Sequence, residues 1–334
     1  METVIDGNIL MDFFRNQPKQ IPFGTEEDNN AWNSFWNFLK SKTDLDVRNF
    51  NSGDSLQEAF LKGLTTGRGD SKISLDNNTP IYNDGCFIAR KPSTLYCLYE
   101  GDENNKKALD NNNGYVVAFQ DNYTHQWERL SLLKHDKTLS VRTEVYDNKN
   151  VFESWSKLGD YLIKFTDVVI VDNYIFSSDE LIPSNFEKIL IELSKATPVK
   201  FNLTIYTFEG RGQSRLNGKM LMRKLNSIVE ANNINCNIQL ALAFNKVKEH
   251  DRGIFTNYLR IKSGDSFNYF NSKGEVITSG TDIDFHSMID PNLRAAAKNV
   301  LHDLNNKLNS MINAKVLVPY VYGECENMLL TQFD

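Results

Sequence analysis

Five residues in the second half of the chain have types and spacing suited to chemistry on a phosphate group. They are His250, Arg252, Asn257, Gly264 and Asn268. An imidazole can act as a nucleophile, a guanidinium can hold two phosphate oxygens, and a glycine permits a tight turn. The spacing predicts that an imidazole, a cation and a turn gather at one strand end.

Basic residues cluster in two stretches of this half. Residues 211–224 contain five basic residues and no acidic one. Residues 246–262 contain five basic residues and two acidic ones, a local charge of +3 in a chain of net charge −6. Such patches attract phosphate or a nucleic-acid backbone, so Arg211 and Arg215 are candidate phosphate ligands. The solvated face of a helix explains equally well the basic residues Lys219, Arg223 and Lys224.

The spacing resembles the signature of the phospholipase D superfamily, which is His-x-Lys, four residues, Asp, six residues, Gly-Ser, two residues and Asn. His250, Arg252, Asn257, Gly264 and Asn268 stand at the corresponding positions. The run IVDNYIF at 170–176 is also similar to the strand that opens a phospholipase D-like unit. The resemblance covers residues 150–285, under half of the chain.

In that family the histidine attacks phosphorus to form a phospho-enzyme intermediate, and the lysine binds the phosphoryl oxygens. The resemblance implies that His250 is the nucleophile, Arg252 the phosphate clamp, and Asn257 and Asn268 the residues that hold the site. Gly264 and Ser266 would contact the phosphate together with Arg211 and Arg215. No metal or cofactor is implied. A second histidine protonates the leaving group, and since the chain has one motif, a full site would require a homodimer.

The chain departs from the family at three positions. Arg252 keeps the charge of the lysine with another geometry, Asn257 lacks the carboxylate, and Asp265 places a negative charge where the family has serine. Three interpretations follow. The first is a metal-independent phosphodiesterase or nuclease, which would suit prokaryotic anti-phage defence. The second is a catalytically degenerate module that binds phosphate, nucleic acid or a partner protein without turnover. A third keeps His250 as a structural histidine at a strand entrance.

The elements that must position these residues alternate from 151 onward. Strands are expected at 167–176, 200–208, 237–244 and 254–261, and helices at 152–163, from Ser184, and after Arg215. This order predicts an α/β fold: a phospholipase D-like mixed, largely parallel sheet flanked by helices, with ligands at the carboxyl ends of strands. A helix at 291–312 could join two copies, and a strand at 315–321 would return to the sheet.

The first half predicts an N-terminal α/β or α+β domain of unknown role over residues 1–150, followed by the phospholipase D-like domain over 151–334. Strands are expected at 2–12, 45–50, 94–99, 115–119 and 138–144, and helices at 26–42, 55–64 and 125–133, with a loop or lid at 70–93. Asp6 closes the first strand, as in metal nucleases of the PIN type, but no acidic residues closing later strands can be placed. Arg68, in a loop, is a weaker candidate for touching phosphate.

Composition sets the broad class. The chain has 334 residues, 40% hydrophobic and 24% charged, which is typical of a water-soluble globular protein of two domains. The net charge of −6 argues against a protein whose whole surface binds nucleic acid or anionic membrane. The four cysteines are scattered and predict free thiols. No signal peptide and no membrane-spanning run is found, so the expected location is the cytoplasm.

Overall fold

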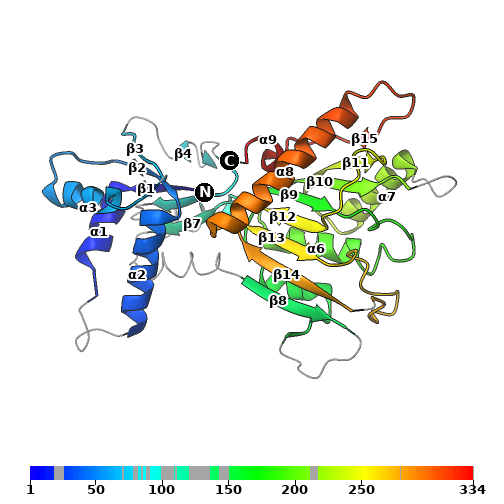
Figure 1. Cartoon of the computed structure of the whole chain (residues 1–334), viewed down its shortest axis with the longest axis horizontal. Coiled ribbons are helices and arrows are strands. Elements are labelled where there is room, and N and C mark those ends of the chain that lie inside the picture. The colour runs from blue at the N-terminus through cyan, green and yellow to red at the C-terminus, as the bar shows by residue number, and fades with distance from the viewer. Residues whose placement is uncertain are drawn as a thin grey trace. The chain divides into compact units, whose positions relative to one another are not determined.

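The computed structural model describes residues 1–18, 26–69, 71–77, 82–83, 86–87, 91–98, 109, 111–119, 136–142, 150–210, 217–278 and 280–333. The chain divides into two compact units (Figure 1). The first comprises residues 1–134 with 289–291, and the second residues 135–288 with 292–333. Each unit has its own main sheet flanked by helices, which confirms the expected mixed α/β class.

The first unit is built on a parallel sheet of five described strands in the order β3-β2-β1-β6-β7. Its strands are β1 (Glu2–Asp6), β2 (Asp44–Arg48), β3 (Ile73–Leu75), β6 (Thr94–Leu98) and β7 (Val116–Phe119), with a separate hairpin of β4 (Tyr82–Asn83) and β5 (Cys86–Phe87). Its helices are α1 (Gly7–Arg15), α2 (Glu26–Ser41) and α3 (Ser55–Thr65). The aromatic face of α2 is part of the core, since Trp32 stacks on Phe13 at 4.7 Å and Phe35 is fully buried.

Two expectations for this unit are wrong. The first strand ends at Asp6, whose carboxylate accepts a hydrogen bond from the Asn8 N–H at 2.8 Å and caps α1. Arg68 is buried and donates to the backbone oxygens of Leu39, Thr43 and Ser71. Its guanidinium therefore holds the chain together and has no face for a phosphate. The helix expected at 125–133 lies outside the described residues.

The second unit contains a mixed sheet in the order β15-β11-β10-β9-β12-β13-β14-β8. The strands are β8 (Asp136–Val141), β9 (Asp167–Val171), β10 (Phe201–Phe208), β11 (Cys236–Ala243), β12 (Gly253–Thr256), β13 (Leu259–Ser263), β14 (Thr281–Ser287) and β15 (Val321–Tyr322). Parallel pairing is confined to β9, β10 and β11 among the described strands of this sheet, so the sheet is mixed but not largely parallel. Strand β8, expected in the N-terminal domain, pairs with β14 here.

Helices cover both faces of this sheet. The short 3₁₀ helix η2 (Trp155–Asp160), α6 (Phe186–Ala196) and α7 (Gly218–Ala231) pack on one core, and α8 (Pro291–Ile312) and α9 (Met328–Thr331) pack on the other. Figure 1 shows α8 crossing one face, with α6 on the far side of the strands. In the described part of the chain, no helix is long and apolar enough to cross a bilayer.

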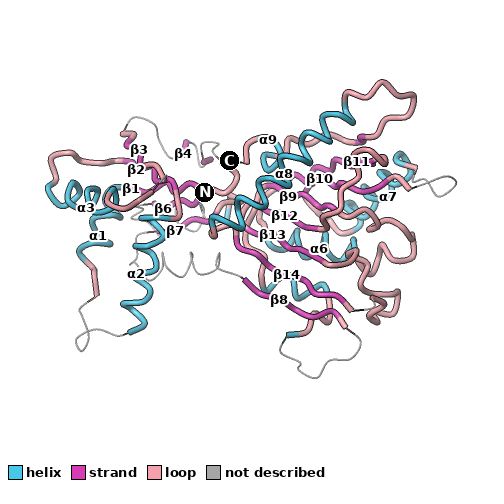
Figure 2. Tube along the Cα trace, in the orientation of Figure 1, coloured by secondary structure: helices cyan, strands magenta, loops and turns pink. Residues whose placement is uncertain are grey.

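Three predicted elements of the second unit differ from the observed ones. The helix at 152–163 is the shorter η2, since Phe152, Trp155 and Leu158 are buried at the three-residue spacing of a 3₁₀ turn. The strand at 254–261 is the antiparallel hairpin β12–β13. The last strand is only β15, and Figure 2 shows loop between α8 and β15.

Candidate functional site

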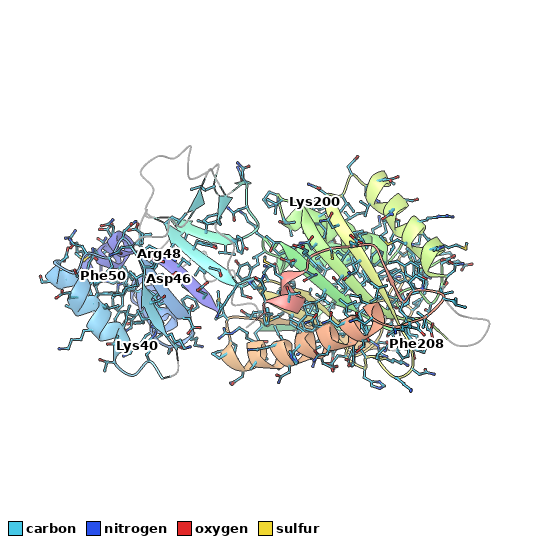
Figure 3. The ribbon with its side chains drawn as sticks, turned by 90° about the horizontal axis from the view of Figure 1, so that it is seen from above. Lys40, Asp46, Arg48, Phe50, Lys200 and Phe208 are labelled. Carbon is cyan, nitrogen blue, oxygen red and sulfur yellow. The ribbon has the colours of Figure 1, made fainter. Side chains whose placement is uncertain are left out.

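Three polar side chains meet at the carboxyl edge of β9, on three neighbouring strands. Asp172 follows β9, Thr207 lies near the end of β10, and Arg252 directly precedes β12. The register pairs Val171 with both Tyr206 and Gly253, so the three are neighbours across the sheet. Side chains alternate along strands, which places all three on the face of the α6–α7 core. Figure 3 labels Lys200 and Phe208 at the two ends of β10, and the site lies at the Phe208 end.

Asp172 is the buried anchor of this edge. Its carboxylate accepts hydrogen bonds from the Tyr174 N–H (2.9 Å), the Ser266 hydroxyl (2.8 Å) and the Phe267 N–H (2.7 Å). Burial raises the pKa of Asp172, and these hydrogen bonds and the charge of Arg252 only partly oppose that rise. Asp172 therefore fastens the loop after β13 to the end of β9.

Arg252 is the cation of the site. Its Nη1 donates to the Gly264 carbonyl oxygen at 2.9 Å, and the side chain is half-buried. Its Nε is buried and has no hydrogen-bond partner among the described residues. One guanidinium N–H at this edge is thus withdrawn from water without an acceptor among the described residues.

The predicted residues after β13 are brought to the same edge, but two of them serve the loop. The Gly264 position has no room for a side chain, because a Cβ there would lie 2.7 Å from the Thr281 hydroxyl oxygen. Ser266 donates to Asp172, so its hydroxyl proton is committed. Both carboxylate oxygens of Asp265 accept hydrogen bonds, from the Ser266 N–H and the Thr278 hydroxyl. Asp265 therefore acts within its own loop.

Asn268 and Asn173 add acceptors. The Asn268 Nδ2 donates to the Tyr174 carbonyl oxygen at 2.7 Å, and the Asn173 Nδ2 donates to the Glu249 carbonyl oxygen. These bonds fix the orientation of both amides. Each Oδ1 is buried without a partner in the described structure, as is the Thr207 hydroxyl. Among the described residues, this edge therefore holds buried polar atoms without hydrogen-bond partners: one donor, Arg252 Nε, two amide oxygen acceptors, and the Thr207 hydroxyl, which can do either.

His250 is exposed at this edge. Its backbone N–H donates to Glu249 Oε1 at 2.7 Å, and no described residue hydrogen-bonds to either ring nitrogen. Glu249 Oε1 also accepts from the Asp251 N–H, and Oε2 accepts from Lys307 on α8 at 2.6 Å. Burial alone would raise the pKa of Glu249, but these hydrogen bonds lower it overall. The backbone of the His250 segment is thus tied to α8, while the imidazole is left unoriented.

Asn257 is not part of this site, contrary to the prediction. It lies after β12, at the other end of that strand from Arg252 and about 16 Å away along the extended chain. Its Oδ1 accepts from the N–H groups of Thr166 (2.9 Å) and Asp167 (3.0 Å) at the start of β9. Asn257 therefore holds the opposite edge of the sheet.

Lys248 and Phe208, which were not predicted from the sequence as site residues, form a cluster with Tyr174 at the site edge. Lys248 Nζ lies 3.0 Å from the Tyr174 hydroxyl and 4.8 Å from the centroid of the Phe208 ring. Tyr174 is exposed, and the polar run after β9 was the only signal pointing to it. The cluster adds a second cation to this edge of the sheet.

The basic residues around the loop after β10 divide into two groups. Arg211 and Arg215 lie outside the described residues. On α7, Lys224 pairs with Asp179 at 2.9 Å and Arg223 is exposed. The α7 residues therefore fit a solvated helix face.

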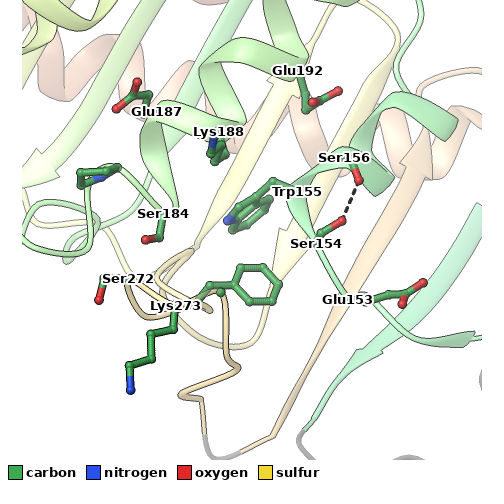
Figure 4. Close-up of a pocket in the computed structure, with 13 residues that line it drawn as sticks. Glu153, Ser154, Trp155, Ser156, Ser184, Glu187, Lys188, Glu192, Ser272 and Lys273 are labelled. Atoms are coloured by element: carbon green, nitrogen blue, oxygen red, sulfur yellow. Dashed lines mark hydrogen bonds between the residues drawn. The ribbon is translucent and has the colours of Figure 1, made fainter.

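A hollow of about 650 Å³ elsewhere in this unit contains none of the predicted residues. It lies between η2, the start of α6 and the loop 270–274, with Trp155 and Phe270 among its lining residues (Figure 4). Its carboxylates and lysines are mixed, and Glu187 and Glu192 already bind Asn232 and Lys195. The described residues also contain no group of three or more metal-binding side chains.

Comparisons with known proteins give little beyond this. No protein-family model and no curated protein matches the chain. Among solved structures, phosphatidylserine synthase of Haemophilus influenzae is similar at a TM-score of 0.29 and 10% identity, over 63% of this chain and 47% of the synthase chain. The likeness thus spans about half of that enzyme, and at this score it has no weight for function.

Proposed function

We propose that the second unit is a phospholipase D-like module that binds a phosphate-bearing ligand through Arg252 and does not turn it over. The motif spacing and the mixed sheet support the family part of this proposal. The observation that carries the binding part is the buried Arg252 Nε, which has no partner among the described residues. A buried donor that makes no hydrogen bond is costly in free energy. The guanidinium group of arginine matches the geometry of phosphate oxygens, so a phosphate is a suitable acceptor.

Two features argue against turnover. A nucleophilic imidazole needs a partner that fixes its orientation, and no described residue hydrogen-bonds to the ring of His250. Asn257, expected to support the nucleophile, lies at the other edge.

Binding can be measured by fluorescence anisotropy with a fluorescein-labelled single-stranded oligonucleotide as the phosphate-bearing probe. A charge-assisted hydrogen bond is worth about 1.5–3 kcal/mol, so Arg252→Ala should weaken binding by about tenfold to 150-fold. The matched control is Arg223→Ala, which removes the same charge from the exposed face of α7. Equal losses in the two variants would mean that only net charge matters, and the proposed site would be wrong.

Phosphodiester hydrolysis is the second candidate, favoured by the exposed His250 imidazole two residues before Arg252. It predicts cleavage of bis(p-nitrophenyl) phosphate in the presence of EDTA, lost in His250→Ala, from a protein whose solution mass is that of a dimer. That result would replace the binding-only proposal. No cleavage by the wild type, with oligonucleotide binding intact, supports the binding module.

A further inference from the structure

The segment between α8 and β15 forms an exposed loop on the second unit. It is anchored at both ends: the Asn313 N–H donates to the Asn309 carbonyl oxygen at 3.0 Å, and the Tyr320 carbonyl oxygen accepts from the Leu242 N–H at 2.8 Å. The Tyr320 ring also packs on Phe244 at 4.7 Å. Because β15 runs antiparallel to β11, this loop lies at the carboxyl edge of β11, the same edge of the sheet as Arg252.

The loop presents aliphatic side chains to water. Leu317 is fully exposed at 105%, Val318 is 68% exposed and Val316 is 44% exposed, and Ile312 at the end of α8 is 53% exposed. We call these four residues the aliphatic tip. Single exposed apolar residues need no explanation, but a contiguous group marks a surface that something else covers.

The segments that flank the aliphatic tip carry lysines. Lys315 lies within the loop and Lys246 follows β11, and both are exposed. The carboxylates of the same β11–β12 connection are already paired, Glu249 with Lys307 and Asp251 with Arg260. Neither Lys315 nor Lys246 has an ion-pair partner among the described residues, so this part of the edge offers two lysines to a negatively charged surface.

The residue types decide what kind of surface this is. Protein–protein interfaces are enriched in aromatic residues and arginine and depleted in lysine. The aliphatic tip has the opposite composition and protrudes as a loop. Aliphatic side chains that enter the acyl boundary, with lysines at head-group level, are typical of attachment to anionic bilayers. The long side chain of Lys315 can keep its charge at the head groups while its neighbours insert.

We propose that the aliphatic tip docks the second unit onto the surface of an anionic lipid bilayer. This inference does not depend on phosphate binding at Arg252, although the two features share one edge of the sheet. It concerns a local surface of a chain whose net charge is −6, so binding depends on the aliphatic tip as well as on charge.

The first experiment is co-sedimentation with vesicles made of equal parts phosphatidylcholine and phosphatidylglycerol. Burying one leucine side chain is worth about 1.5–3 kcal/mol, so Leu317→Asp should lower the vesicle partition coefficient by about tenfold or more. Vesicles of phosphatidylcholine alone should bind weakly. The variant should keep the wild-type oligonucleotide affinity, which separates a failure of this proposal from a failure of the phosphate site.

A second measurement reports insertion directly. In Leu317→Trp, tryptophan emission should shift to the blue when the anionic vesicles are added. The control is Lys200→Trp, an exposed position at the opposite edge of the same sheet, where no shift is expected. Absence of vesicle binding by the wild type, or equal shifts in both variants, would overturn the proposal. So would a wild-type dimer that Leu317→Asp converts to monomer without any vesicle binding, because a second copy would then cover the aliphatic tip.

Discussion

Asn257→Ala tests whether this residue supports the fold rather than the site. The side chain is fully buried and joins the β12–β13 turn to the start of β9. Its Oδ1 accepts from two backbone N–H groups, of Thr166 and Asp167, and its Nδ2 donates to the Thr166 hydroxyl at 3.0 Å. Alanine removes all three hydrogen bonds and supplies no replacement acceptor.

The cost follows from the donors that are left behind. Each buried N–H without an acceptor costs about 1–3 kcal/mol, and the variant leaves two such groups, the N–H groups of Thr166 and Asp167. Thr166 is half-buried, so water can partly replace the lost acceptor there. We therefore expect Asn257→Ala to lower the free energy of unfolding by about 2–4 kcal/mol. Affinity for the oligonucleotide should stay within about twofold of wild type, since Asn257 and Arg252 lie at opposite ends of β12, about 16 Å apart along the extended chain.

Urea denaturation followed by far-UV circular dichroism measures the stability change. Amide hydrogen exchange of a peptide that contains Thr166 and Asp167 should also accelerate in the variant. The matched control is Asn309→Ala, which removes an exposed asparagine from the outer face of α8 and should change stability little. A variant that keeps wild-type stability but loses oligonucleotide binding would refute the structural role and return Asn257 to the site.

Two further predictions concern the same unit. Because burial raises the pKa of Asp172, the folded state holds its proton to higher pH than the unfolded state, so this group's contribution to stability is greatest below about pH 4 and falls as the pH rises through the folded pKa. An asparagine at this position would not titrate, so the Asp172→Asn variant should not lose stability in this way. Between about pH 4 and pH 7 the urea midpoint of the wild type should therefore fall relative to that of the variant, and a constant difference between the two midpoints would contradict this. Gly323→Ala should destabilise the unit by about 2 kcal/mol or more, because φ is +74° and a Cβ would lie 2.3 Å from the Ile238 carbonyl oxygen. An unchanged urea midpoint in Gly323→Ala would show that β15 adds little to the sheet.

Long apolar patterns were sufficient to predict most large elements. The four aliphatic residues from Val168 to Val171 predicted a buried strand, and β9 is buried along its whole length. The helical spacing of Ile189, Leu190 and Leu193 predicted α6, and all three are core residues. In these segments local preference and tertiary burial favour the same structure, so one sequence is enough.

Short elements depended on contacts that the local sequence does not contain. Residues 254–261 were predicted as one strand, in which Ile254 and Ile261 would point to opposite faces, but the hairpin pairs them and puts both in one core. The turn between them depends on Thr256, whose hydroxyl oxygen accepts from the Leu259 N–H, and on Asn257, which reaches residues about ninety positions away. The site has the same origin, since Asp172, Thr207 and Arg252 become neighbours only through the crossovers between strands.

The hairpin explains why the spacing of the motif predicted the correct edge for some residues and the wrong edge for one. The four residues between Arg252 and Asn257 are strand β12, and Gly264 follows directly after β13. The spacing of the motif therefore corresponds to the lengths of two antiparallel strands. The first strand runs away from the site and the second returns to it. Arg252 and Gly264 meet at one edge because of those lengths, and Asn257 marks the far turn. A match in spacing thus supports this hairpin, while the chemistry depends on which side chains stand at His250, Arg252 and Asp172.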